Sequence, residues 1–99
     1  MQSFDDPMWA IRVAVDETFA VELAGNPTTG YTWQADIDPE HLELIEQEFE
    51  PSAAGIGAGG REVFRFHARR AGTTEIRFVY RRPWGGPAQD QRRFRVVVA

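Results

Sequence analysis

The protein has 99 residues, of which 42% are hydrophobic and 26% are charged, and its formal net charge is −4. A chain of this length forms a single domain, residues 1–99, with one hydrophobic core, and its apolar content is not that of a disordered chain. The absence of cysteine excludes disulfide bonds, thiol catalysis and cysteine-ligated zinc, and no apolar run approaches the ~20 residues that a membrane-spanning helix requires.

The first six residues carry two acids and lack the basic and apolar regions of a signal peptide. We therefore expect a cytoplasmic protein unless an export signal has been removed. The compartment itself stays open, because cysteine-free domains occur in every compartment.

Apolar residues then recur with a period of two, which is the period of a β-strand. Seven segments show this alternation, at residues 9–15, 19–23, 31–37, 42–49, 64–68, 76–80 and 94–98. The alternation is least regular in 42–49, where a short helix is the alternative. With turn residues between the segments, the pattern predicts an all-β sandwich or barrel. The aromatic residues expected in its core are Trp9, Trp33, Phe66, Phe78 and Phe94.

Charge is distributed unevenly along the chain. Residues 1–50 contain twelve acids and one arginine, whereas residues 51–99 contain ten arginines and three acids. We interpret this as acidic and basic strands that pair across a sheet. The alternative is an arginine-rich face for nucleic acid, but the arginines alternate with core-type residues and do not gather beside exposed aromatic ones.

The connections between the predicted strands fall into two classes. Those at 16–18, 38–41 and 70–73 are short and polar. Three longer ones are rich in glycine and proline: residues 24–30 (the first loop), 51–60 (the second loop) and 82–89 (the third loop). If successive strands run up and down, every second connection emerges at the same end. The three long loops should therefore meet at one end, which is where a β-sandwich commonly binds a partner.

Each long loop has a distinctive composition. The first reads Asn26-Pro27-Thr28-Thr29-Gly30, in which proline and two β-branched residues restrict the backbone. The second ends in Gly57-Ala58-Gly59-Gly60, which alone indicates a flexible connection rather than a site. The third contains Arg82-Pro83-Trp84, a pairing typical of interaction hot spots, unless Trp84 folds back over the core.

In this order and spacing, Asn-Pro-Thr-Thr-Gly-Tyr, Gly-Ala-Gly-Gly and Arg-Pro-Trp resemble the three-loop signature of the chagasin family. The resemblance spans residues 26–84 and implies an immunoglobulin-like, two-sheet antiparallel sandwich of about seven to eight strands. It also implies a reversible inhibitor of papain-like cysteine peptidases that is monomeric when free, with the peptidase as its partner.

The resemblance assigns a role to each loop. Asn26, Pro27, Thr28, Thr29 and Gly30 would enter the catalytic centre, with the two threonines over the Cys–His pair of the peptidase. Tyr31 and Trp33 alternate as core residues, so we interpret them as supports for this loop. The second loop would pair its backbone with one side of the cleft, through Gly57, Ala58, Gly59 and Gly60. The third would clamp the other side with Arg82, Pro83 and Trp84.

An enzymatic function is not supported by the titratable residues. His41 and His67 lie in different segments, neither Ser3 nor Ser52 occupies a nucleophile elbow, and the carboxylates show no zinc-binding spacing. We expect no cofactor, no metal, and no nucleic-acid or membrane partner. The alternative to an inhibitor is an immunoglobulin-like adhesion or carbohydrate-binding module.

Overall fold

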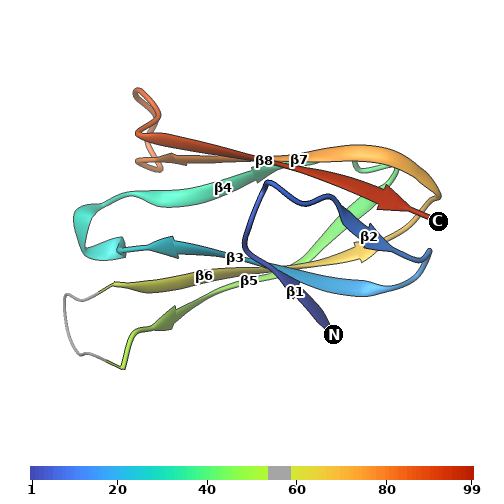
Figure 1. Cartoon of the computed structure of the whole chain (residues 1–99). Helices are drawn as coiled ribbons and strands as arrows, with labels where there is room; N and C mark the ends of the chain where they lie inside the picture. The colour runs from blue at the N-terminus through green and yellow to red at the C-terminus, as the bar shows by residue number, and fades with distance from the viewer. Residues whose placement is uncertain (54–58) are drawn as a thin grey trace.

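The computed structural model describes residues 1–53 and 59–99, and within them eight strands form two stacked sheets (Figure 1). Sheet A has the strand order β1-β3-β6-β5, with bounds Gln2–Phe4, Thr18–Gly25, Gly60–Ala68 and Leu42–Pro51. Sheet B has the order β2-β8-β7-β4, with bounds Ile11–Val13, Asp90–Val98, Gly72–Arg81 and Thr32–Asp36. The predicted all-β, two-sheet fold is confirmed.

The long strands pair as expected, but the two N-terminal strands do not. The pairings β3–β6, β5–β6, β4–β7 and β7–β8 are antiparallel. In contrast, β1 runs parallel to β3, and β2 runs parallel to β8. Both sheets are therefore mixed, and residues 5–10 carry the chain from the edge of one sheet to the edge of the other.

The prediction that Trp9 is buried is wrong, because its side chain is 69% exposed. The strand expected over 9–15 is shortened to β2, Ile11–Val13. Before it the chain turns around Asp6, whose carbonyl and carboxylate oxygens accept the backbone N–H groups of Trp9 and Met8. The apolar alternation thus runs on into a turn that lies outside the core.

Residues 42–49, the segment with the least regular alternation, belong to strand β5 and form no helix. The register with β6 shifts between Leu44 and Glu46, so Ile45 is the extra residue of a β-bulge. A bulge reverses which side chains face the core along one strand. Leu42, before the bulge, is buried, whereas Leu44 and Ile45 beside it are exposed. After the bulge, Gln47 and Phe49 pair with the inward-facing Phe64 and Glu62, so the inward positions change from even to odd numbers and the period is broken.

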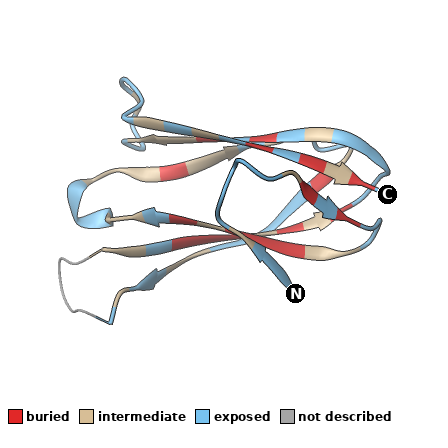
Figure 2. Ribbon diagram, in the orientation of Figure 1, coloured by how far each residue is buried: buried red, intermediate tan, exposed pale blue. Residues whose placement is uncertain are grey.

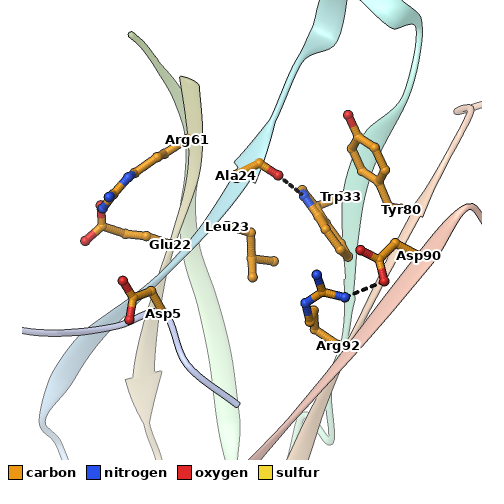
Figure 3. A pocket seen from close by; sticks show the side chains of 9 residues that line it. All are labelled: Asp5, Glu22, Leu23, Ala24, Trp33, Arg61, Tyr80, Asp90 and Arg92. Carbon is orange, nitrogen blue, oxygen red and sulfur yellow. Dashed lines mark hydrogen bonds and ion pairs between the residues drawn. The ribbon is translucent and has the colours of Figure 1, made fainter. Parts of the chain in front are cut away.

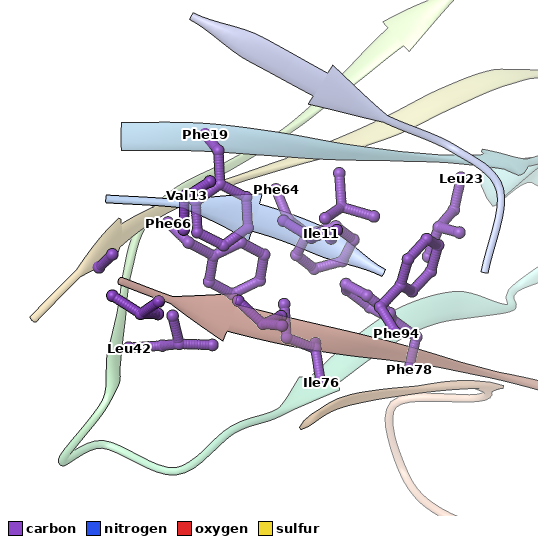
Figure 4. Close-up of a cluster of buried hydrophobic side chains, with 14 of the residues drawn as sticks. Ile11, Val13, Phe19, Leu23, Leu42, Phe64, Phe66, Ile76, Phe78 and Phe94 are labelled. Atoms are coloured by element: carbon purple, nitrogen blue, oxygen red, sulfur yellow. The ribbon is translucent and has the colours of Figure 1, made fainter. Parts of the chain in front are cut away.

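The core lies between the sheets and is built on phenylalanine (Figures 2 and 4). The ring centroids of Phe64 in sheet A and Phe78 in sheet B are 4.9 Å apart, and Phe78 meets Phe94 edge to face at 5.6 Å. Trp33, Phe66, Phe78 and Phe94 are buried as predicted. No helix in the described part of the chain is long and apolar enough to cross a membrane.

On the outer faces, oppositely charged side chains pair between neighbouring strands as predicted. Arg65 on β6 lies 2.7 Å from Glu48 and 3.4 Å from Glu46 on β5. On the other sheet, Arg77 lies 3.1 Å from Asp36. The hydrogen bond from Arg65 to Glu48 raises the pKa of the guanidinium further above its usual value, so the group stays charged.

Candidate functional site

The first loop, the third loop and the described ends of the second loop lie together at one end of the sandwich, opposite the short turns (Figure 1). A Cβ placed on Gly30 would lie 3.8 Å from Cη2 of Trp84 in the third loop. A Cβ placed on Gly59 in the second loop would lie 3.4 Å from Cβ of Asn26. The first loop therefore lies between the other two. That the three loops share one end is what the alternation of short and long connections predicts.

The first loop is fixed by its own hydrogen bonds. Pro27–Thr29 form a turn of 3-10 helix, η1, capped by Asn26. The Asn26 Oδ1 accepts from the Thr28 N–H at 3.2 Å and from its hydroxyl at 2.6 Å, and the Thr29 hydroxyl donates to the Asn26 carbonyl at 2.7 Å. Gly30 closes the turn at φ 83°, a conformation that favours glycine. The result is a preformed projection on which Pro27, Thr28 and Thr29 are exposed (Figure 2).

Side chains below the first loop hold it against the sandwich. The Asn26 N–H donates to the Tyr80 hydroxyl at 3.2 Å, and the Trp33 indole N–H donates to the Ala24 carbonyl at 2.9 Å. The rings of Tyr31 and Tyr80 stack with centroids 5.5 Å apart. Trp33 is only 3% exposed, so the predicted supporting position of this residue is the one observed.

The third loop presents Trp84 to solvent. Its side chain is 78% exposed, which excludes the alternative that it caps the core. The Arg82 guanidinium lies 4.6 Å from the centroid of the Tyr31 ring and 6.0 Å from that of Trp84. Arg82 thus links the third loop to the foot of the first by cation–π contacts, a role that its composition alone did not indicate.

In the second loop, Gly59 and Gly60 are described, whereas Gly57 and Ala58 lie outside the described residues. Gly60 pairs with Gly25 on one side and with Pro51 on the other. A Cβ on Gly60 would lie 2.1 Å from the Glu50 carbonyl oxygen, so only glycine fits. The second loop therefore ends beside the foot of the first.

Two groups near this end were not assigned roles from the sequence. The first is the Tyr80 hydroxyl, which accepts from the first loop. The second is Glu62, a carboxylate 8% exposed on the core-facing side of β6. The sequence does contain a signal for the burial of Glu62: residue 62 lies at an even-numbered position of β6, like the inward-facing Phe64, Phe66 and Ala68.

A groove of about 420 Å³ lies on one flank of the sandwich, where β3 faces β8 (Figure 3). Four of its charged side chains form pairs: Arg61 pairs with Glu22 at 3.2 Å, and Arg92 pairs with Asp90. Asp5 is the fifth charged side chain that lines it. The groove contains no constellation of nucleophile and base. Across residues 1–53 and 59–99, no group of three histidine, aspartate or glutamate side chains could hold a metal ion.

Residues 12–98 match the family model described as chagasin family peptidase inhibitor I42. The chain belongs to the chagasin family. Chagasin of Trypanosoma cruzi is 37% identical over 94 residues, covering 89% of this chain and 86% of that protein. The predicted function, inhibition of cysteine peptidases, is confirmed at the level of the family, and the protein is not an enzyme. The adhesion or carbohydrate-binding alternative is not favoured.

Solved structures of chagasin-type inhibitors share the fold. The crystal structure of the cysteine protease inhibitor EhICP2 from Entamoeba histolytica superposes with a TM-score of 0.83 at 19% identity, covering 99% of this chain and 94% of that one. PbICP-C, in its complex with falcipain-2, superposes with a TM-score of 0.67 at 17% identity, covering 99% and 88%. At these identities the likeness establishes the fold, and the family model and Trypanosoma cruzi chagasin establish the family.

Proposed function

We propose that this protein inhibits papain-like cysteine peptidases reversibly, by seating the three-loop end of its sandwich across the active-site cleft. The observation that carries the proposal is the rigid, exposed turn Pro27–Thr29 between two flanking loops. A cleft enzyme needs a convex partner, and the first loop is the central projection of this end (Figure 1).

Resistance to cleavage follows from the conformation of the first loop. A substrate is cleaved when its scissile carbonyl is held in line with the nucleophile. Thr28 and Thr29 instead lie in a 3-10 turn, closed by the hydrogen bond from the Gly30 N–H to the Pro27 carbonyl at 3.0 Å. The turn fills the cleft without presenting an extended peptide, and its internal hydrogen bonds lower the entropy cost of binding.

The flanking loops supply the remaining contact surface. We assign Gly57, Ala58, Gly59 and Gly60 to backbone pairing along one wall of the cleft, and Arg82, Pro83 and Trp84 to the other wall. Trp84 provides the largest exposed apolar side chain of the described loop residues. Three loops of this size can bury about 1,600 Å² in total, the usual area of protease–inhibitor interfaces.

Titration of papain with the folded protein tests the proposal. We expect stoichiometric, reversible loss of activity, and an intact inhibitor chain by mass spectrometry after prolonged incubation. Papain whose active-site cysteine carries a small alkyl group should still bind, because the block is steric. Full papain activity in the presence of excess folded protein, repeated with cathepsin-type peptidases, would refute it.

A further inference from the structure

Glu62 is a charged side chain in an unusual place. It is 8% exposed and is the one buried polar or charged side chain among residues 1–53 and 59–99. It also points into the space between the sheets rather than outward. Burial of a carboxylate is costly unless hydrogen bonds compensate for the lost water. The partners of Glu62 therefore indicate why it is there.

Those partners all belong to other strands. The Glu62 carboxylate accepts from the backbone N–H of Trp33 at 2.8 Å and from the Thr32 hydroxyl at 2.8 Å, both on β4 of the opposite sheet. Gln47 on β5 donates through its Nε2 to the same carboxylate at 3.5 Å and to the Trp33 carbonyl at 3.3 Å.

Two of these hydrogen bonds go to the backbone of an edge strand. β4 is the last strand of sheet B, so the backbone groups on its outer side have no neighbouring strand. Glu62 satisfies the N–H of Trp33 and Gln47 satisfies its carbonyl, so two side chains from sheet A replace the missing strand. They thereby tie the edge of sheet B to sheet A near the three-loop end.

The hydrogen bonds of Glu62 lie next to the ends of the first and second loops. Glu62 follows Gly60, the end of the second loop, by two residues. Thr32 and Trp33 follow Gly30, the end of the first loop. The carboxylate also packs beneath the entry to the first loop, since a Cβ on Gly25 would lie 3.3 Å from its Oε2. One carboxylate therefore contacts the feet of both loops.

We propose that Glu62, with Gln47, is a positioning residue for inhibition: it fixes the first loop relative to the second in the geometry that enters the cleft. The inference rests on the proposed function. Glu62 does not touch the peptidase, so its loss lowers the fraction of inhibitor in the binding-competent conformation. A smaller competent fraction slows association and leaves dissociation of the formed complex nearly unchanged.

The test compares Glu62→Ala with Leu42→Ala, measuring association and dissociation rate constants with papain. Leu42 is fully buried at the far end of the sandwich, so its substitution destabilises the fold without touching the loops. At a temperature where both variants are folded, we expect Glu62→Ala to associate about tenfold more slowly, as when a tenth of the population is competent. Leu42→Ala should keep the wild-type rates. Wild-type association by Glu62→Ala, or equal slowing by both variants, overturns the proposal.

Two further measurements apply if Glu62→Ala does not fold or if the wild-type protein does not inhibit papain. If Glu62→Ala does not fold, Glu62→Gln, which retains one carbonyl oxygen, should associate at an intermediate rate, and a wild-type rate overturns the proposal. If the wild-type protein fails to inhibit papain, the proposed function fails separately. Amide hydrogen exchange then decides the positioning role: exchange from Thr28 to Trp33 should accelerate in Glu62→Gln while the far end is unchanged, and unchanged exchange in this segment overturns it.

Discussion

Trp84→Ala should weaken inhibition while leaving the stability of the fold intact. The side chain is 78% exposed, and it lies near Gly30 and the Arg82 guanidinium at the same end. Removal of the indole opens no core cavity, so the free energy of unfolding should change by no more than about 0.5 kcal/mol. Truncation of an interface tryptophan typically costs about 2 kcal/mol of binding free energy, which is roughly a thirtyfold loss of affinity.

The kinetics of the loss can also be predicted. Most changes to a formed interface act on the dissociation rate. Trp84→Ala should therefore release papain about thirtyfold faster, with little change in association. This is the opposite of the pattern expected for Glu62→Ala, so the two variants separate direct contact from positioning.

Trp33→Ala is the matched comparison. Trp33 is 3% exposed, its ring lies 4.8 Å from that of Tyr80, and its indole N–H is bonded to the Ala24 carbonyl. Its loss should destabilise the fold by about 3–5 kcal/mol, which lowers the melting temperature by about 12 °C or more in a domain of this size. Melting temperature and inhibition constant are measured for both variants. A Trp84→Ala protein that melts far lower yet inhibits normally when folded would refute the assigned roles.

Three further expectations follow from the geometry. Gly60→Ala should lower the melting temperature by at least about 4 °C, because its Cβ meets the Glu50 carbonyl and overpacking costs about 1 kcal/mol or more. The Ser3 hydroxyl donates to Glu22 and lowers the pKa of its carboxyl in the folded protein. As the pH falls, the Glu22 carboxyl is therefore protonated at a higher pH in the unfolded chain than in the folded protein. Stability should therefore fall as the pH drops below about 4, and less steeply in Glu22→Gln, as followed by thermal melts. Trp9→Ser should change the unfolding free energy in urea by less than about 0.5 kcal/mol, because Trp9 is exposed.

The long strands and the loop end could be predicted from the sequence because both leave local signals. A period of two over five or more residues identifies a strand with one buried face, as in β7 and β8. Glycine and proline then mark the connections. The alternation of short and long connections was enough to place Thr28, Gly59 and Trp84 at one end.

The remaining features depend on contacts distant in the sequence. β1 and β2 have three residues each, too few for a period, and their parallel partners lie across the fold. The prediction that Trp9 lies in the core is wrong for the same reason, because alternation does not reveal where such a short strand begins. Likewise, nothing local to Glu62 indicates that Trp33 and Thr32 of the other sheet come within hydrogen-bonding distance.

The loops also differ in what they join, and this determines how freely each can vary. The first loop spans the two sheets, from β3 to β4, whereas the second and third each connect two neighbouring strands of one sheet. Extra residues in such a connection extend outward and cost little, since loop-closure entropy rises slowly with length. Extra residues in the crossing loop would shift the capped turn against both sheets. The first loop is therefore restricted in length, whereas the second and third loops can change in length. To redirect the protein to a new target peptidase, the second and third loops should be varied and the first left unchanged.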